Sequence, residues 1–244
     1  MPTLALIVLA TLAGGLLSMT VAALFALGIP NRWLPRLTGF SAGVLLAAAL
    51  LDLLPEASAG LEPQALFATV LAGLIGFFAL ERIALWRHDH HLDGGGVAGR
   101  LILLGDAFHN FVDGVLLAAA FLTSTELGWA ATLAVIAHEI PQEAGDFLLL
   151  RLSGYSKARA FLYNALSSLA AVAGGVMGYF LLEDAQEALP YALALAAASF
   201  LYIAVADLMP FLHRQRGASA ALWQGALIAA GVAIVPLAGH FAHH

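Results

Sequence analysis

Apolar residues along the chain fall into eight long runs, which are separated by short polar or glycine-containing breaks. A helix that crosses the hydrocarbon core of a bilayer needs about 20 mostly apolar residues, and each run is close to that length. The pattern therefore predicts an all-α polytopic membrane protein, a bundle of eight transmembrane helices in which residues 1–244 form a single transmembrane domain. The expected helices span residues 3–28, 37–55, 63–80, 101–122, 129–150, 160–182, 189–211 and 220–241.

The composition of the chain supports this interpretation. Its 244 residues are 61% hydrophobic and 11% charged, whereas about a quarter of the residues in a soluble domain are charged. Most of the surface must therefore meet lipid. The apolar run at the N-terminus has no basic segment before it, so we expect a retained span rather than a cleaved signal peptide. The sequence contains no cysteine, which excludes disulfides and thiolate metal ligands.

The ten lysine and arginine residues fall only at the first, third, fifth and seventh connections between the expected helices. Among charged residues, the second, fourth and sixth connections carry acids alone. Because cytoplasmic loops are enriched in lysine and arginine, we expect the odd connections in the cytoplasm and both termini outside. The expected location of the protein is the cell (inner) membrane. The longest connection, residues 81–100, is too short for a nucleotide-binding domain, so we expect neither an ATP-binding partner nor a nucleic-acid partner.

Two neighbouring expected helices contain an unusual number of polar residues. An ionisable side chain inside a span costs at least about 2.5 kcal/mol and is retained mainly for function. In the fourth helix, His109 lies four residues before Asp113 and three after Asp106, a spacing that places all three on one face. The fifth helix carries a stripe with similar spacing, formed by His138, Glu139, Gln142, Glu143 and Asp146. A single membrane histidine or aspartate often only links two helices, but that role does not explain the whole cluster.

The donor atoms of this cluster favour a divalent metal. Imidazole nitrogen and carboxylate oxygen suit zinc, iron and manganese, and weaker carboxamide ligands allow the release that transport requires. Pro141 lacks an N–H, so we expect it to kink the fifth helix and expose the Ala137 carbonyl beside the ligands. The candidate metal ligands are His109, Asn110, Asp113, His138, Glu139, Gln142 and Glu143, and candidate path or accessory residues are Asp52, Asp106 and Asp146.

Two other functions remain open. The segment 138–142 approximates the HExxH motif of zinc proteases, but Gln142 replaces the second histidine and Pro141 interrupts the turn. We therefore expect no enzyme and keep a membrane-embedded zinc-dependent hydrolase as the alternative. A metal exporter would share the ligand chemistry, and the direction of flux would separate it from an importer.

These residues closely resemble the ZIP (Zrt/Irt-like) family of divalent metal transporters. Segment 109–114 matches the family pattern HNFxDG, and segment 138–147 matches HExPHExGDF of one subfamily except at Gln142, where histidine is usual. Segments 52–57 and 105–106 also look like that subfamily. The resemblance implies uptake of zinc, or of iron, manganese or cadmium, toward the cytoplasm.

The resemblance also implies a two-metal centre and a homodimer. One metal would be bound by His109, Asp113, His138 and Gln142. The second would be bound by Asn110, Asp113, Glu139 and their neighbours. Gly174 and Gly178 form a small-xxx-small pair, which permits close helix packing within the bundle or in a dimer.

Histidines also gather outside the expected spans. His88, His90 and His91 lie in the cytoplasmic connection 81–100 between the third and fourth helices, and His240, His243 and His244 lie at the C-terminus. A histidine-rich loop after the third helix is common in the family and could receive the exiting ion. The alternative is that these short clusters are simply solvated.

Overall fold

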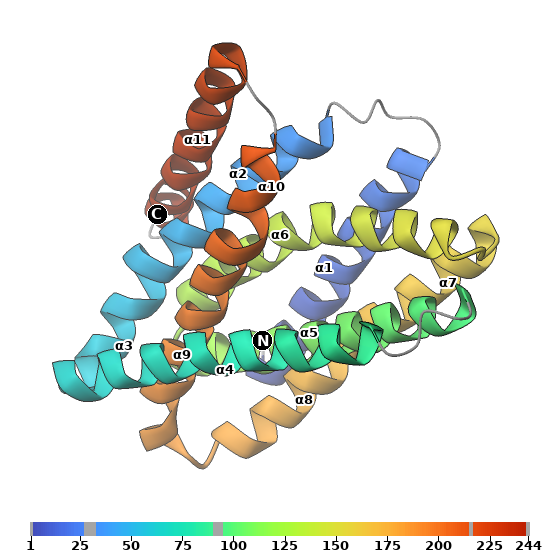
Figure 1. The fold of residues 1–244 in the computed structure, drawn as a ribbon. Helices are drawn as coiled ribbons and strands as arrows, with labels where there is room; N and C mark the ends of the chain where they lie inside the picture. Colours follow the sequence, from blue (N-terminus) through green and yellow to red (C-terminus); the bar gives the residue numbers. More distant parts are fainter. Residues whose placement is uncertain (1, 27–32, 90–94, 215–216, 243–244) are drawn as a thin grey trace.

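The computed structural model describes residues 2–26, 33–89, 95–214 and 217–242, and within these ranges its regular elements are all helices (Figure 1). Eight helical segments correspond to the eight predicted spans. They are α1 (Thr3–Ala26); α2 (Leu34–Ala47) with η2 (Ala48–Leu53) and α3 (Leu54–Gly60); α4 (Pro63–Asp89); α5 (Gly95–Thr123); α6 (Thr125–Leu152); α7 (Lys157–Ser168) with α8 (Ala170–Leu182); η3 (Gln186–Ala188), α9 (Leu189–Tyr202), η4 (Ile203–Leu208) and α10 (Met209–His213); and α11 (Ala218–Ala242).

Seven of these segments, in the described part of the chain, are long and apolar enough to cross a membrane. The exception is α6, which has 28 residues but contains Glu139, Glu143 and Asp146 within its length. The residues that make this helix chemically interesting therefore also lower its hydropathy. The all-helical, multi-pass membrane class is confirmed, and the eighth crossing by α6 stays a prediction.

The connection between α4 and α5 is shorter than the sequence suggested. We expected a loop over residues 81–100, but α4 continues to Asp89 and α5 begins at Gly95. Hydropathy marks where a helix leaves the lipid, and a helix can continue beyond that point into water. His90 and His91 lie outside the described residues, and the side chain of His88 is not described.

Two pairs of helices pack with their backbones in contact. A Cβ atom added to Gly174 of α8 would lie 1.9 Å from the carbonyl oxygen of Phe111 on α5. Similarly, a Cβ added to Gly43 of α2 would lie 2.1 Å from the carbonyl oxygen of Ile228 on α11. Glycine is required at such crossings because any side chain would force the helices apart. The small-xxx-small pair of α8 thus packs within the bundle, since Gly178 faces Val115 and Ala118 of α5.

Two spans contain a π-helical stretch at an Asp-Leu-x-Pro sequence. Residues 52–55 follow this pattern in η2 and α3, and residues 207–210 follow it in η4 and α10. The N–H of Leu54 bonds to the Ala49 carbonyl, and that of Met209 bonds to the Ala204 carbonyl. Proline cannot donate a hydrogen bond, which locally loosens the α-helical ladder and admits the wider turn. Such turns are frequent at functional sites.

The α5–α8 crossing leads to a first testable prediction. Substitution Gly174→Ala should lower the melting temperature of the purified protein, because overpacking at a tight contact typically costs about 1–3 kcal/mol. Gly225→Ala is the matched control, since a Cβ on this α11 glycine has nothing within 4 Å. Thermal unfolding in detergent measures both variants, and equal melting temperatures would contradict the close packing.

Candidate metal centre

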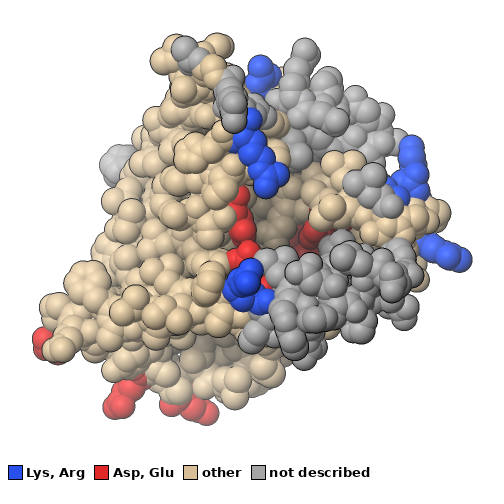
Figure 2. All heavy atoms as spheres, in the orientation of Figure 1, with Lys and Arg blue, Asp and Glu red and all other residues tan. Residues whose placement is uncertain are grey.

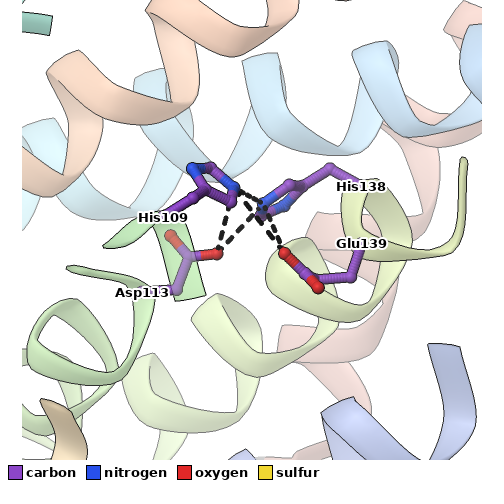
Figure 3. A group of neighbouring side chains, drawn as sticks. All are labelled: His109, Asp113, His138 and Glu139. Atoms are coloured by element: carbon purple, nitrogen blue, oxygen red, sulfur yellow. Dashed lines mark hydrogen bonds and ion pairs between the residues drawn. The ribbon is translucent and has the colours of Figure 1, made fainter. Parts of the chain in front are cut away.

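Four side chains from two helices converge at one point (Figure 3). His109 and Asp113 come from α5, and His138 and Glu139 come from α6. One donor atom from each of the four lies within 4.8 Å of the others. The two imidazole Nε2 atoms are 3.1 Å apart, and Asp113 Oδ2 lies 3.1 Å from His138 Nε2 and 3.6 Å from His109 Nε2.

The spacing of these atoms suits a tetrahedral ion. Glu139 Oε1 lies 3.6 Å from His109 Nε2 and 3.8 Å from His138 Nε2. When zinc binds four ligands at about 2.0–2.1 Å, neighbouring ligand atoms are about 3.3–3.4 Å apart. These five distances scatter around that value, and the two carboxylate oxygens lie within 4.8 Å of each other, so side-chain adjustments would bring all four atoms to bonding distance of one cation.

Local contacts orient His138. Its Nδ1 lies 2.9 Å from the carbonyl oxygen of Ala134, one turn earlier in α6. A carbonyl can only accept, so the proton belongs on Nδ1 and the lone pair of Nε2 is directed at the other three side chains. The ring also packs against Phe200 of α9, with 5.9 Å between ring centroids. This is the tautomer that binds a metal through Nε2.

The group is buried, and the oxygens of its two carboxylates lack hydrogen-bond partners in the described part of the chain. The side chains of His138, Asp113 and Glu139 are 0%, 1% and 3% exposed. Neither oxygen of Asp113 or Glu139 has a hydrogen-bond partner among the described residues. Buried carboxylates are normally paired with a cation or hydrogen-bond donors, because desolvation is expensive. The donor set and the missing partners together fit a divalent cation.

Several predicted site residues belong to a second polar cluster between α5, α6 and α7. Asp106 accepts a hydrogen bond from Asn110 Nδ2 at 3.0 Å and another from the Ser167 hydroxyl. Asn164 Nδ2 donates to the carbonyl oxygen of Glu143 at 3.1 Å. Both carboxylate oxygens of Glu143 are buried and without a hydrogen-bond partner in the described chain. Asp106 and Asn110 therefore bond to each other, and Asp106 is not among the four residues whose donor atoms converge.

A cavity of about 230 Å³ reaches one side of the group. His109 lines it, as do Gln142 and the acidic residues Glu81 and Asp207. The Tyr202 hydroxyl, also in this wall, donates to the Glu81 carboxylate. His109 is 21% exposed and is the one member of the group that this cavity touches. Figure 2 shows a hollow on this view of the molecule, with acidic atoms inside it and lysine and arginine side chains around it.

A second cavity, of about 420 Å³, lies at the other end of the spans. Its wall includes the carboxylates of Asp52, Glu56 and Glu126, from the end of the second span and the start of α6. It also includes Ala130, which is eight residues before His138 in α6. Asp52 is thus placed beside a cavity but away from the four-residue group.

The structure differs from the sequence interpretation in two details. The interatomic distances group Glu139 with His109, Asp113 and His138, whereas the sequence assigned it to a second metal; the assignment of Gln142 to the first metal stays a prediction. We also expected Pro141 to leave the Ala137 carbonyl exposed, and this was wrong: the carbonyl accepts a hydrogen bond from the Ser41 hydroxyl of α2. The role of Ser41 could not be recognised from the sequence, because a single serine in an apolar helix is common.

Known proteins are similar to this chain. The family model described as "ZIP Zinc transporter" matches residues 86–238. Zinc transporter ZIP13 of Pongo abelii is 34% identical over 224 residues, which is 84% of this chain and 66% of the relative. Zinc transporter ZIP4 of Mus musculus is 43% identical over 116 residues, or 48% of this chain and 17% of the relative. Zinc transporter ZIP6 of Homo sapiens is 38% identical over 110 residues, or 45% and 15%. The chain therefore spans at most 66% of the length of these relatives.

The geometry predicts a measurable loss of metal affinity. His138→Ala removes a central donor atom, and we expect zinc affinity of the purified protein to fall at least about tenfold, as measured by competition with a chelating dye. The matched control is His213→Ala, an exposed histidine at the end of α10. An unchanged affinity in His138→Ala would mean that zinc binds elsewhere.

Proposed function

This chain belongs to the ZIP family of zinc transporters, and from that premise we propose that it carries zinc or a related divalent cation across the membrane toward the cytoplasm. The observation that carries the proposal is the buried group of two imidazoles and two carboxylates without hydrogen-bond partners, whose donor atoms lie within 4.8 Å of one another. The relatives of this chain are named zinc transporters. Nothing in the described part of the chain favours the zinc hydrolase or the exporter.

In this proposal the four residues have complementary roles. Asp113 and Glu139 supply two negative charges, which balance the charge of a divalent cation in a site of low polarity. His109 and His138 supply neutral nitrogen ligands, which favour zinc and other borderline metals over magnesium and calcium. Gln142 lines the first cavity together with His109, so we propose that it replaces one of the four ligands as the ion leaves.

Glu143, together with Asn110 of α5, is our candidate for a second cation position. Both oxygens of Glu143 are buried without a partner, and the neighbouring donors are oxygen atoms of carboxylate and carboxamide groups. Such a position would be harder in character than the four-residue group, because it offers no imidazole. Asp106 and Asp146 lie close enough to Glu143 to interact with it electrostatically, but they are not assigned as ligands.

The two cavities suggest the route of the ion. The second cavity ends near Ala130, about 12 Å before His138 at 1.5 Å per helical residue. The buried side chains of Ala131, Ala134 and Val135 occupy the interval. The first cavity, in contrast, touches His109. This supports a state in which the centre opens to one side of the membrane only.

The charge pattern indicates which side that is. Glu81 of α4 and Asp207 of η4 line the open cavity and lie next to the connections that carry basic residues. We therefore place this cavity on the cytoplasmic side and the cavity beside Asp52 outside. The ion would then leave toward the segment that contains His88, His90 and His91. The homodimer remains our expectation for the assembly.

Transport can be tested directly. Zinc influx into sealed proteoliposomes without ATP should be saturable for the wild type and fall at least about tenfold in His109→Ala and Glu139→Ala, because each substitution removes a ligand. His213→Ala should transport normally. A wild type that binds zinc but moves neither zinc, cobalt, iron nor manganese would refute the proposal.

Uptake should also depend on pH. A protonated imidazole has no lone pair for a metal, so protons compete with the cation at His109 and His138. We expect zinc influx to decrease as the pH is lowered from about 7 toward about 5. Flux that increases on acidification would show that these histidines do not bind the ion as neutral ligands.

A further inference from the structure

The carbonyl group of Ala137 has lost its helical partner. In an uninterrupted α-helix it would accept a hydrogen bond from the N–H of residue 141, but that residue is Pro141. Ala137 is buried, so water cannot readily replace the missing donor. Leaving a buried acceptor unpaired is unfavourable, and the fold must provide another donor.

Ser41 of α2 provides that donor. Its hydroxyl donates to the Ala137 oxygen across the α2–α6 contact, and its side chain is buried. The Ser41 hydroxyl oxygen also lies 2.8 Å from the carbonyl oxygen of Leu37, in its own helix. One hydroxyl proton is therefore shared by two acceptors. By contrast, the buried Ser18 of α1 bonds to the Gly15 carbonyl of its own helix. Ser41 therefore forms a hydrogen bond to a second helix as well as the usual one within its own helix.

The position of this bond matters because it adjoins the metal centre. Ala137 directly precedes His138 and Glu139, two of the four converging residues. The preceding turn is already held by the bond between His138 Nδ1 and the Ala134 carbonyl. Ser41 itself is fixed in place, because Gly43, two residues later, packs against the backbone of α11.

We propose that Ser41 is a positioning residue for the metal centre. Its hydroxyl substitutes for the N–H that Pro141 lacks and fixes the backbone turn at residues 137–139. The donor atoms of His138 and Glu139 are then already directed at His109 and Asp113 before the cation arrives. This inference rests on the proposed function, because it concerns the same site. It adds a residue from α2, a helix that contributes no member of the group.

The test is a double-mutant cycle on zinc affinity in lipid nanodiscs. Ser41→Ala should weaken zinc binding about tenfold, in the range that loss of a group orienting a metal ligand usually costs. It should also alter the visible absorption spectrum of bound cobalt, which reports ligand geometry. In a Pro141→Ala background the helix regains its own N–H donor, so adding Ser41→Ala should change affinity less than about twofold.

Controls separate positioning from general damage. Ser18→Ala removes a buried hydroxyl that bonds to its own helix and should leave zinc affinity unchanged. Ser41→Thr keeps the hydroxyl, and Ser41→Val has the shape of threonine without the hydroxyl. Zinc affinity should therefore be retained in Ser41→Thr and reduced in Ser41→Val. Equal affinities for these two variants, or an equal loss from Ser41→Ala in both backgrounds, would overturn the inference. A wild type that binds no zinc would instead refute the proposed function.

Discussion

The desolvation of two neighbouring carboxylates, Asp113 and Glu139, inside an apolar bundle is the main physical constraint on the proposed metal centre. Each ionised group inside a span costs at least about 2.5 kcal/mol, and neither has a hydrogen-bond partner among the described residues. In the proposed centre, a divalent cation would offset both this desolvation and the repulsion between the two carboxylates. The surrounding contacts therefore orient the donor atoms and leave their lone pairs free for an ion.

Backbone groups carry much of this orientation. The Ala134 carbonyl fixes the tautomer of His138, and the Ala137 carbonyl is held by Ser41. Side-chain ligands can rotate, but carbonyl groups within a packed helix cannot, so they are good anchors. The glycine contacts act in the same sense on a larger scale. They let α5 and α8 approach until backbone meets backbone, which limits how far the Asp113 side of the centre can shift.

The sequence was sufficient to predict the helical segments and the convergence of α5 and α6, because hydropathy and i, i+4 spacing are local properties. It could not place the Glu139 carboxylate beside His109 and His138, since the direction of a side chain on one helix becomes clear only when the partner helix is in place. It also missed Ser41, whose acceptor lies 96 residues away in the sequence. The loop expected over residues 81–100 was too long because hydropathy marks the edge of the lipid and not the end of a helix.

The separation of the two cavities has an electrical consequence. Water and ions that fill a cavity hold it near the potential of the adjoining solution, so the transmembrane voltage falls mainly across the packed residues between the cavities. That layer is about 12 Å thick along α6, less than half of a typical hydrocarbon core. The field there is correspondingly steeper. A divalent cation that crossed it toward the negative side would gain about 4.6 kcal/mol per 100 mV, so membrane potential alone would concentrate the ion.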